Sequence, residues 1–418
     1  DNAYVFYDGP PFITGVPHHG TLLSSIVKDA VPRYWTMKGK RVERRWGWDC
    51  HGLPAENFVE KQLNIVDRRQ IVTSSDQPAP LDKDGQPLPT ISLEKYITKA
   101  RESMVANSET WQGVIDRIGR WVDFKGAYRT MDKDFMESVW WAFKQLYEAG
   151  KIYEGEKVLM YDTKFATPVS KAEVTMDNDA YQTVTDPSVY VKFKLVDSDY
   201  SILAWTTTPW TLPANLLLAV NPEMTYCEVL VDGEKLIIAE EAFERTLQDE
   251  KHQPLDYEVL RKFPGSELVG KKYQPLDTGS TWPENDKIHT IYAADFVSHE
   301  SGTGIVHIAP AYGEDDFELA KSYGISAFHV IDDNGYYTDT NYKGLEVWEN
   351  NKFIAKDLKE KGVVWKIEYI RHEYPFNPRS KQRIMYRAIP SWFFAIQGQK
   401  PLMLDENEHI NWFPAHLK

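Results

Sequence analysis

The start of the chain constrains the fold most, because strand-like and helix-like patterns alternate there within a short stretch. Residues 3–7 (AYVFY) are rich in β-formers and run into the turn sequence DGPP. Apolar residues then recur at helical spacing from His18 to about Lys38, and residues 41–49 (RVERRWGWD) are again typical of a strand. A strand, a helix and a strand in this order predict a βαβ unit with two parallel strands and a right-handed crossover.

The patterns after this unit change once more along the chain. Helical patterns continue over 93–118 and 133–150, separated from the first unit by a polar, proline-rich stretch at 65–91 that predicts a loop or insertion. From about residue 186, short strand-like runs such as SVYVKFKL and EKLIIA dominate. Further helices are expected at 313–322 and 351–361.

These changes predict three segments. Residues 1–185 would form the first part of an α/β domain, residues 186–370 a β-rich α+β domain inserted into it, and residues 371–418 the return to the first domain. The chain has 418 residues, which is long enough for two or three domains with large cores. Its strand-like first residues and its unmarked end lead us to expect a piece of a longer protein.

Composition narrows the class of protein. The chain is 42% hydrophobic and 26% charged, as in soluble globular proteins, and no apolar run approaches the roughly 18 residues that a membrane span needs. No signal peptide is visible, and the two cysteines, Cys50 and Cys227, form no Cys-x-x-Cys pair. A net charge of −14 argues against indiscriminate nucleic-acid binding but permits a local basic groove.

The turn DGPPFITGVPHHG lies where the first strand would meet the first helix. Ligands of open α/β sheets bind beyond the carboxyl ends of strands, and a helix N-terminus attracts anions. Gly20 permits close backbone approach, while His18 and His19 can donate hydrogen bonds to phosphate oxygens. Asp49, at the end of the next strand, could pair with an ammonium group. Together these residues predict a nucleotide beside an amine-bearing substrate; taken singly, they could equally be a solvated turn and a surface ion pair.

Five motifs occur in one order along the chain: DGPPFITGVPHHG, GWDCHGLPAE, RIGRWVDF, WTTTPWTLPAN and GTGIVHIAPAYGEDDF. Together they resemble the class I aminoacyl-tRNA synthetases of the isoleucyl type, and the resemblance extends over nearly the whole chain. GWDCHGLP resembles the isoleucyl enzymes more than their valyl and leucyl relatives. The resemblance implies a Rossmann-like parallel-sheet nucleotide-binding domain interrupted by a β-rich editing domain.

The resemblance assigns roles to residues of the first motifs. His18 and Gly20 match the family signature His-x-Gly-His, which holds ATP, and Thr21 stands where the second histidine is expected. Thr21 can donate a hydrogen bond but is never cationic, so either Thr21 or the neighbouring His19 would replace that histidine. Asp49 matches the ligand of the amino-acid ammonium group, and Pro11 lies in the segment that lines the same pocket.

The implied reaction is activation of isoleucine by ATP with Mg²⁺, followed by transfer of the acyl group to tRNA(Ile). Such sites act mainly by positioning and by stabilising charge on phosphate oxygens. The family's lysine-rich loop has only a weak counterpart in RSKQR at 379–383, so we expect that loop and the anticodon-binding domain beyond residue 418.

A second set of residues resembles a hydrolytic editing site. One methylene distinguishes isoleucine from valine and is worth only about 1–3 kcal/mol in a pocket, so a second site must remove the smaller product. By resemblance, the threonines and the asparagine would orient the ester and its water, the histidine would restrict the pocket, and the aspartate would hold the ammonium group of misacylated valine. Singly, TTTP could be a capped turn and EDD a helix-start charge cluster. The residues concerned are Thr206, Thr207, Thr208, Asn215, His307 and Asp316.

The resemblance further implies isoleucine, ATP and tRNA(Ile) as partners of a monomeric protein in the cytoplasm, without a membrane. Two stretches, MYDTKFATPVS and YPFNPRSKQRIMYRA, lack the cysteines that some relatives carry in similar contexts, so no structural zinc is expected in this piece. Two alternatives stay open: a free-standing hydrolase of misacylated tRNA, and a non-catalytic relative suggested by Thr21.

Overall fold

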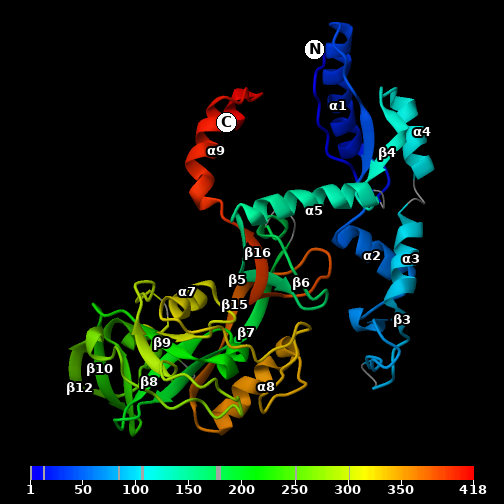
Figure 1. Ribbon diagram of the computed structural model, residues 1–418. Coiled ribbons are helices and arrows are strands. Elements are labelled where there is room, and N and C mark those ends of the chain that lie inside the picture. The colour runs from blue at the N-terminus through cyan, green and yellow to red at the C-terminus, as the bar shows by residue number, and fades with distance from the viewer. Residues whose placement is uncertain are drawn as a thin grey trace. The chain divides into compact units, whose positions relative to one another are not determined.

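The computed structural model describes residues 2–12, 15–82, 85–104, 108–175, 180–249, 252–300 and 302–418. The chain divides into two compact units, one formed by Asp1–Tyr153 with Phe394–Lys418 and the other by Glu154–Phe393 (Figure 1). The fold is mixed α/β, with both parallel and antiparallel strand pairs. No helix in these ranges is long and apolar enough to cross a membrane.

The first unit is built on a parallel pair of strands, β1 and β4, that bury a cluster of tryptophans. Trp46 and Trp48 of β1 pack edge-on at 5.4 Å, and Trp111 lies 5.7 Å from Trp48. Gly47, between them, leaves room for the ring of Tyr128 on β4, which a Cβ would approach to 2.3 Å. The elements of this unit are α1 (His19–Met37), β1 (Arg45–Trp48), α2 (Leu53–Gln62), β2 (Ile71–Val72), β3 (Ile91–Ser92), α3 (Leu93–Ser103), α4 (Ser108–Ile118), β4 (Asp123–Arg129), α5 (Lys133–Glu148) and α9 (Lys400–Glu408).

The predicted helix after the first turn is confirmed as α1. It ends at Met37, and Gly39, two residues later, has a φ of 86° that permits the left-handed turn that stops a helix. Part of the apolar stripe that the helical spacing predicts is exposed, including Leu23, Val27 and Met37. The helical pattern predicted over 93–118 appears as α3 and α4; its residues 105–107 lie outside the described ranges.

The strand predicted at residues 3–7 is wrong. This segment makes only isolated parallel bridges, from Ala3 to Arg41 and from Phe12 to Asp49. Between those bridges a cavity of about 340 Å³ separates the segment from β1, so its backbone makes no continuous ladder. The parallel partner of β1 in the described chain is instead β4.

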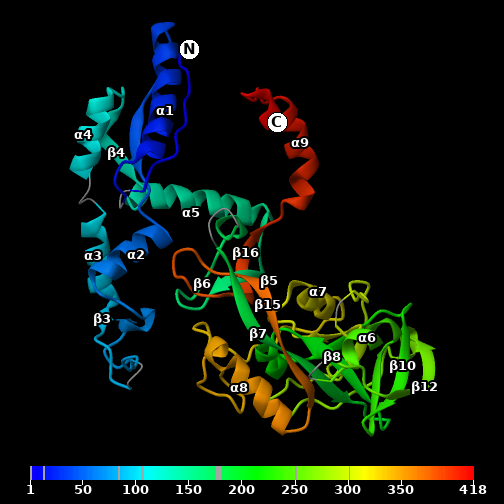
Figure 2. The same ribbon diagram turned by 180° about the vertical axis from the view of Figure 1, so that it is seen from behind.

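The second unit holds three sheets. The largest has the order β12-β10-β11-β8-β7-β15, and two smaller sheets have the orders β13-β9-β14 and β16-β5-β6 (Figure 2). The elements are β5 (Ile152–Asp162), β6 (Thr167–Pro168), β7 (Tyr181–Lys194), β8 (Ser201–Thr206), β9 (Leu217–Val220), β10 (Thr225–Val231), β11 (Glu234–Ala239), α6 (Phe243–Thr246), β12 (Tyr257–Pro264), β13 (Thr290–Ala293), β14 (Ile305–Ile308), α7 (Glu314–Ser322), α8 (Val347–Glu360), β15 (Val364–Pro375) and β16 (Ile384–Phe394). The helices expected at 313–322 and 351–361 correspond to α7 and α8.

The chain passes between the two units within β5 and β16, whereas the sequence patterns change near residues 185 and 370. The difference arises because the strands of the β16-β5-β6 sheet belong to the second unit. β5 and β6 precede the run of short strands that marks this unit in the sequence, and β16 follows that run.

A buried carboxylate joins two turns of the second unit. Asp162 Oδ2 accepts hydrogen bonds from Asn377 Nδ2 at 2.6 Å and from the hydroxyl of Ser380, while Oδ1 accepts one from the backbone N–H of Phe165 at 2.7 Å. Asp162 is fully buried. The cysteine-free stretches MYDTKFATPVS and YPFNPRSKQRIMYRA therefore meet at this hydrogen-bonded carboxylate.

We predict that Asp162→Ala lowers the free energy of unfolding by about 3 kcal/mol, because it leaves the donors of Asn377 and Ser380 without an acceptor inside the protein. Asp197→Ala, at an exposed position of the same unit, should change it by less than about 0.5 kcal/mol. Urea unfolding of both variants measures the difference. Equal stabilities would show that this carboxylate does not hold the turns.

Candidate functional site

The N-terminus of α1 is capped by Thr21. The Thr21 hydroxyl accepts a hydrogen bond from the backbone N–H of His18 at 2.9 Å and donates one to the His18 carbonyl at 2.7 Å. The hydroxyl proton expected to serve phosphate is thus already used within the helix cap. Gly20 has no side chain and so leaves room for the His18 ring, since a Cβ at this position would lie 3.1 Å from that ring. Local sequence therefore explains both residues as parts of a tight helix start.

A cavity of about 220 Å³ lies at this helix start and brings several predicted residues together. Pro11, His18, Gly20 and Thr21 line it. The exposed His19 does not, and Ile13 and Thr14 of the predicted turn lie outside the described residues. The remaining lining residues are Gly9, Pro10, Ser24, Ser25, Lys28, Trp46, Trp111 and Arg120.

Two cations give this cavity its charge. Lys28 Nζ lies 2.5 Å from Asp8 Oδ1, and Arg120 lies 2.6 Å from Asp8 Oδ2. Arg120 also donates to the hydroxyl of Ser25 at 2.8 Å. Sequence reasoning missed both cations, although Lys28 shares a helix with His18 and Arg120 lies in the RIGRWVDF motif. With two cations and one carboxylate, this end of the unit is suited to an anionic ligand.

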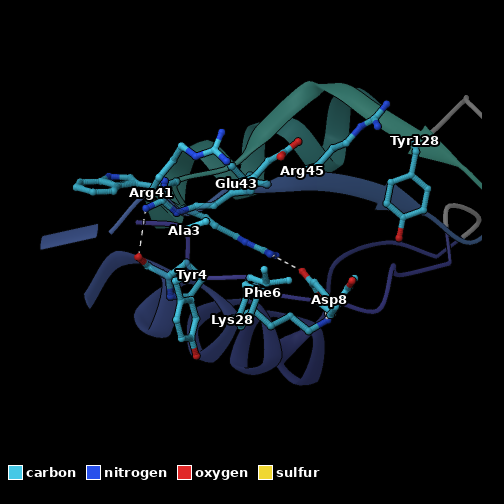
Figure 3. Close-up of a pocket in the computed structure, with 16 residues that line it drawn as sticks. Ala3, Tyr4, Phe6, Asp8, Lys28, Arg41, Glu43, Arg45 and Tyr128 are labelled. Atoms are coloured by element: carbon cyan, nitrogen blue, oxygen red, sulfur yellow. Dashed lines mark hydrogen bonds and ion pairs between the residues drawn. The ribbon is translucent and has the colours of Figure 1, made fainter. Parts of the chain in front are cut away.

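The same cations line the larger cavity between residues 3–8 and the parallel strands. Figure 3 shows Tyr4 and Arg41 at one end of that cavity and Asp8 with Lys28 at the other. The ion pairs of Asp8 therefore lie where the two cavities adjoin.

Asp49 lies beside Pro11 but outside both cavities. Its backbone N–H donates to the Pro11 carbonyl at 2.9 Å, and its carboxylate accepts a weak hydrogen bond from the backbone N–H of His51 at 3.3 Å. The structure therefore brings Asp49 and Pro11 together through the backbone, with the carboxylate turned to the start of the next helix.

The second unit contains a cavity of about 230 Å³ that combines residues from two of the predicted motifs. Thr206 ends β8 and Thr207 follows it, and His307 comes from β14, which packs against β8. Gly302, with a φ of 63°, lets the chain pass close to Trp205, because a Cβ there would lie 3.0 Å from the indole. The other lining residues are Phe296, Ser298, Gly304, Ile305 and Val306.

The ring of His307 is held on both nitrogens. Nε2 lies 2.9 Å from Thr211 Oγ1, and Nδ1 lies 2.8 Å from Asn215 Nδ2. Burial lowers the pKa of His307 to about 3, so the imidazole is neutral at physiological pH. Asn215 is only 1% exposed and lies behind His307. It does not line the cavity, where the family resemblance places it beside the ester.

The threonine hydroxyls form a short chain. Thr206 Oγ1 lies 3.2 Å from Thr208 Oγ1, and Thr208 Oγ1 lies 3.3 Å from Thr211 Oγ1. Helix α8 holds the turn that carries these threonines, because the side-chain oxygen of Asn351 accepts a hydrogen bond from the backbone N–H of Trp210 at 3.1 Å. The chain of contacts therefore runs from His307 through Thr211 and Thr208 to Thr206, which lines the cavity. Thr211 was missed by sequence reasoning, although it lies three residues after Thr208 in the same motif.

Asp316 occupies the first turn of α7, as expected, but it does not line the cavity. Its Oδ2 accepts a hydrogen bond from the backbone N–H of Ala309 at 2.7 Å. The pKa of this carboxyl is raised to about 7, mainly by burial; the hydrogen bond from Ala309 opposes the shift, and the charge of neighbouring Asp315 adds to it. Asp316 is therefore tied to the segment that follows His307.

The family follows from comparison with known proteins. A family model for tRNA synthetases class I (I, L, M and V) matches residues 1–418. The chain belongs to this family. It is 43% identical over 439 residues to the isoleucine–tRNA ligase of Corynebacterium diphtheriae, a match that covers 99% of this chain and 39% of that protein.

Other members are similarly close. The chain is 42% identical to isoleucine–tRNA ligase 2 of Pseudomonas fluorescens and 41% identical to the isoleucine–tRNA ligase of Bdellovibrio bacteriovorus, in each case over 100% of this chain and 38% of the relative. It therefore spans about two fifths of the length of the curated relatives it matches. A solved structure described as the crystal structure of GlLeuRS-CP1 matches 43% of this chain and 99% of that chain at a TM-score of 0.35 and 14% identity, too low to support a conclusion.

Metal ligands are not gathered in the parts of this synthetase that the structure describes. Within those ranges, no group of three or more His, Cys, Asp or Glu side chains could hold a metal ion. Cys50 and Cys227 are both buried as free thiols, and burial raises the pKa of each.

We predict opposite pH dependences of stability from His307 and Asp316, two groups of the second unit whose pKa is shifted by folding. His307, whose pKa falls from 6.5 to about 3 on folding, contributes stability above pH 6.5 that is lost as the pH falls toward 3. Asp316, whose pKa rises from 3.8 to about 7, contributes stability below pH 3.8 that is lost as the pH rises through 7. The two contributions therefore oppose each other between these limits.

Asp316→Asn removes the opposing contribution of Asp316 and keeps those of His307 and of His289, whose pKa burial lowers to about 4, so the melting temperature should rise more steeply between about pH 4 and 6.5 than in the parent. Glu318→Gln removes one charge from an exposed position of the same helix and should keep the parent's slope. Calorimetry across this pH range decides; identical slopes in all three proteins would contradict the assigned shifts.

Proposed function

We propose that the chain is the N-terminal part of an isoleucine–tRNA ligase that activates isoleucine in its first unit and hydrolyses valyl-tRNA(Ile) in its second. The single observation that carries the proposal is the match of 99–100% of this chain to three proteins of that name at 41–43% identity. The presence of separate cavities in the two units supports a division into two chemistries.

In the first unit, β1, β4 and residues 3–12 would form the first half of a Rossmann-like nucleotide-binding domain. ATP, with Mg²⁺, would place its phosphates at the N-terminus of α1, where His18 and the backbone at Gly20 meet the charges of Lys28 and Arg120. Thr21 would act by holding this helix start, since its hydroxyl is used by the cap. Asp49 would turn toward the ammonium group of isoleucine beside Pro11 when the amino acid binds.

The chemistry of activation is a displacement at the α-phosphate. A carboxylate oxygen of isoleucine attacks phosphorus, the bond to the β-phosphate breaks, and pyrophosphate leaves with the electron pair. Charge builds on the non-bridging oxygens, and donors and cations already in place stabilise it without reorganising. The acyl group then passes from the adenylate to the terminal ribose of tRNA(Ile), releasing AMP.

In the second unit, water would attack the ester carbonyl of valyl-tRNA(Ile), and the ribose oxygen would leave with a proton. Thr206 and Thr207, which line the cavity, and Thr208, which is hydrogen-bonded to Thr206, would hold the ester and the water, and His307 would limit the size of the amino-acid side chain. Asp316 lies outside this lining, so its carboxylate would turn from Ala309 toward the cavity to bind the ammonium group. The buried Asp316 carboxyl has a raised pKa, and a bound ammonium group would favour its ionised form.

The remaining parts of the proposal concern organisation. Residues 186–370 would be the core of an editing domain inserted between 1–185 and 371–418 of the catalytic domain. The whole protein would act as a cytoplasmic monomer on isoleucine, ATP and tRNA(Ile), with no structural zinc in this piece.

A crossed pair of variants of the full-length protein tests the division. His18→Ala should reduce isoleucine-dependent pyrophosphate exchange by about 100-fold, because it removes a donor to phosphate, and leave deacylation of preformed valyl-tRNA(Ile) unchanged. Asp316→Asn keeps an acceptor for Ala309 but removes the charge, so it should reduce deacylation by about 100-fold and leave exchange unchanged.

Glu318→Gln, at an exposed position two residues after Asp316 in the same helix, serves as the matched control and should change neither activity. Loss of both activities in either variant would contradict two separate sites. Failure of the unmodified full-length protein to support isoleucine-dependent exchange would contradict the proposed function itself.

A further inference from the structure

The orientation of the Asn215 amide is fixed by its buried surroundings. Tyr273 donates its hydroxyl proton to Asn215 Oδ1 at 2.7 Å, which identifies the oxygen side of the amide. The opposite side, Nδ2, donates to the Leu217 carbonyl at 2.9 Å. A reversed amide would set Oδ1 against that carbonyl, so the observed orientation is the one that satisfies both neighbours.

This orientation determines which nitrogen of His307 carries the proton. Nδ2 has two hydrogens; one serves the Leu217 carbonyl, and the other points at His307 Nδ1 across 2.8 Å, with the Ile308 carbonyl at 3.5 Å only a weak third acceptor. Nδ1 must therefore present a lone pair, and in a neutral ring the proton lies on Nε2.

The other side of the ring agrees with this assignment. Thr211 Oγ1 donates its own proton to the Thr208 carbonyl at 2.8 Å, so toward His307 Nε2, 2.9 Å away, it must accept. Donors and acceptors then run in one direction from Tyr273 through Asn215 and His307 to Thr211 without a conflict. Both ring nitrogens are occupied by protein groups, and neither has a lone pair free for a ligand.

We propose that Asn215, oriented by Tyr273 and the Leu217 carbonyl, is a positioning residue that fixes His307 as the neutral Nε2–H tautomer and prevents it from acting as a general base. The ring then forms an uncharged wall of the cavity, and its orientation is fixed. The functional half of this inference rests on the proposed hydrolysis in the second unit, where a histidine near the ester would otherwise be the obvious acceptor for the proton of the attacking water.

The tautomer can be observed directly by nitrogen NMR of the full chain labelled with ¹⁵N-histidine, with the His307 signals assigned from their absence in His307→Gln. We expect an unprotonated Nδ1 and a protonated Nε2, with shifts that do not change between about pH 5 and pH 8. A protonated Nδ1, or a titration within this range, would overturn the proposal.

Asn215→Asp supplies the matching perturbation. The carboxylate can only accept, so His307 Nδ1 should gain a proton and the ring should switch tautomer or become imidazolium. Asn221→Asp is the control, because Asn221 Nδ2 donates to the Val297 carbonyl at 3.1 Å and not to the ring. The control should leave the His307 signals unchanged; an unchanged tautomer in Asn215→Asp would contradict the positioning role.

The functional half is tested with the full-length protein and preformed valyl-tRNA(Ile). The ratio of deacylation rate constants between parent and His307→Gln should stay constant within about twofold from pH 5.5 to pH 8, because His307 does not titrate there. A ratio that falls about tenfold per pH unit on the acidic side would identify His307 as a base and overturn the proposal. Absence of deacylation by the parent would instead overturn the proposed hydrolysis, while the tautomer would still be decided by NMR.

Discussion

The antiparallel pairing of β7 with β15 is the interaction on which the second unit depends. The register runs from Val191 opposite Val364 to Tyr181 opposite Pro375, so the first and last strands of the six-stranded sheet, in chain order, lie side by side. β8 pairs with the other edge of β7 and ends at the threonine turn. α8 immediately precedes β15 and holds that turn through Asn351. This long strand pair thereby supports the strand that carries the threonine turn, and with it one wall of the cavity.

The opposite wall depends on burying a histidine without a charge. Removing an imidazolium from water would be costly, and the protein avoids this cost by satisfying each nitrogen of neutral His307 with one partner. A neutral, immobile ring suits discrimination by size, because neither its shape nor its charge responds to the ligand. The carboxyl group of Asp316 lies outside the cavity lining and is held by the backbone N–H of Ala309.

Sequence alone was sufficient where the determinants are local. The helix from His18 to Gly39 and the turn after β8 follow from periodicity, prolines and glycine. The segment at 3–7 was predicted as a strand because its residues favour one, but a strand forms only when a neighbour pairs along its length. Family resemblance placed Asn215 in the second site but could not show that its amide lies behind His307.

Contacts between distant positions could not be predicted. Asn215 and His307 are separated by 92 positions, Tyr273 and Asn215 by 58, and Asp162 and Asn377 by 215. Each depends on which strands pair, and no local pattern specifies that. The cations Lys28 and Arg120 could have been suspected from their motifs, but only the shared carboxylate of Asp8 shows that they converge.

The central claim is that the cavity of the second unit takes the terminal valyl-adenosine of a misacylated tRNA and excludes isoleucine. A valyl-adenosine analogue with an amide in place of the ester cannot be hydrolysed and can be located by crystallography of the full-length protein. The account predicts that it binds beside Thr206, Thr207 and His307 and that the isoleucyl analogue binds there at least about tenfold more weakly. Binding of the valyl analogue only at the start of α1, or equal affinity for both analogues, would contradict it.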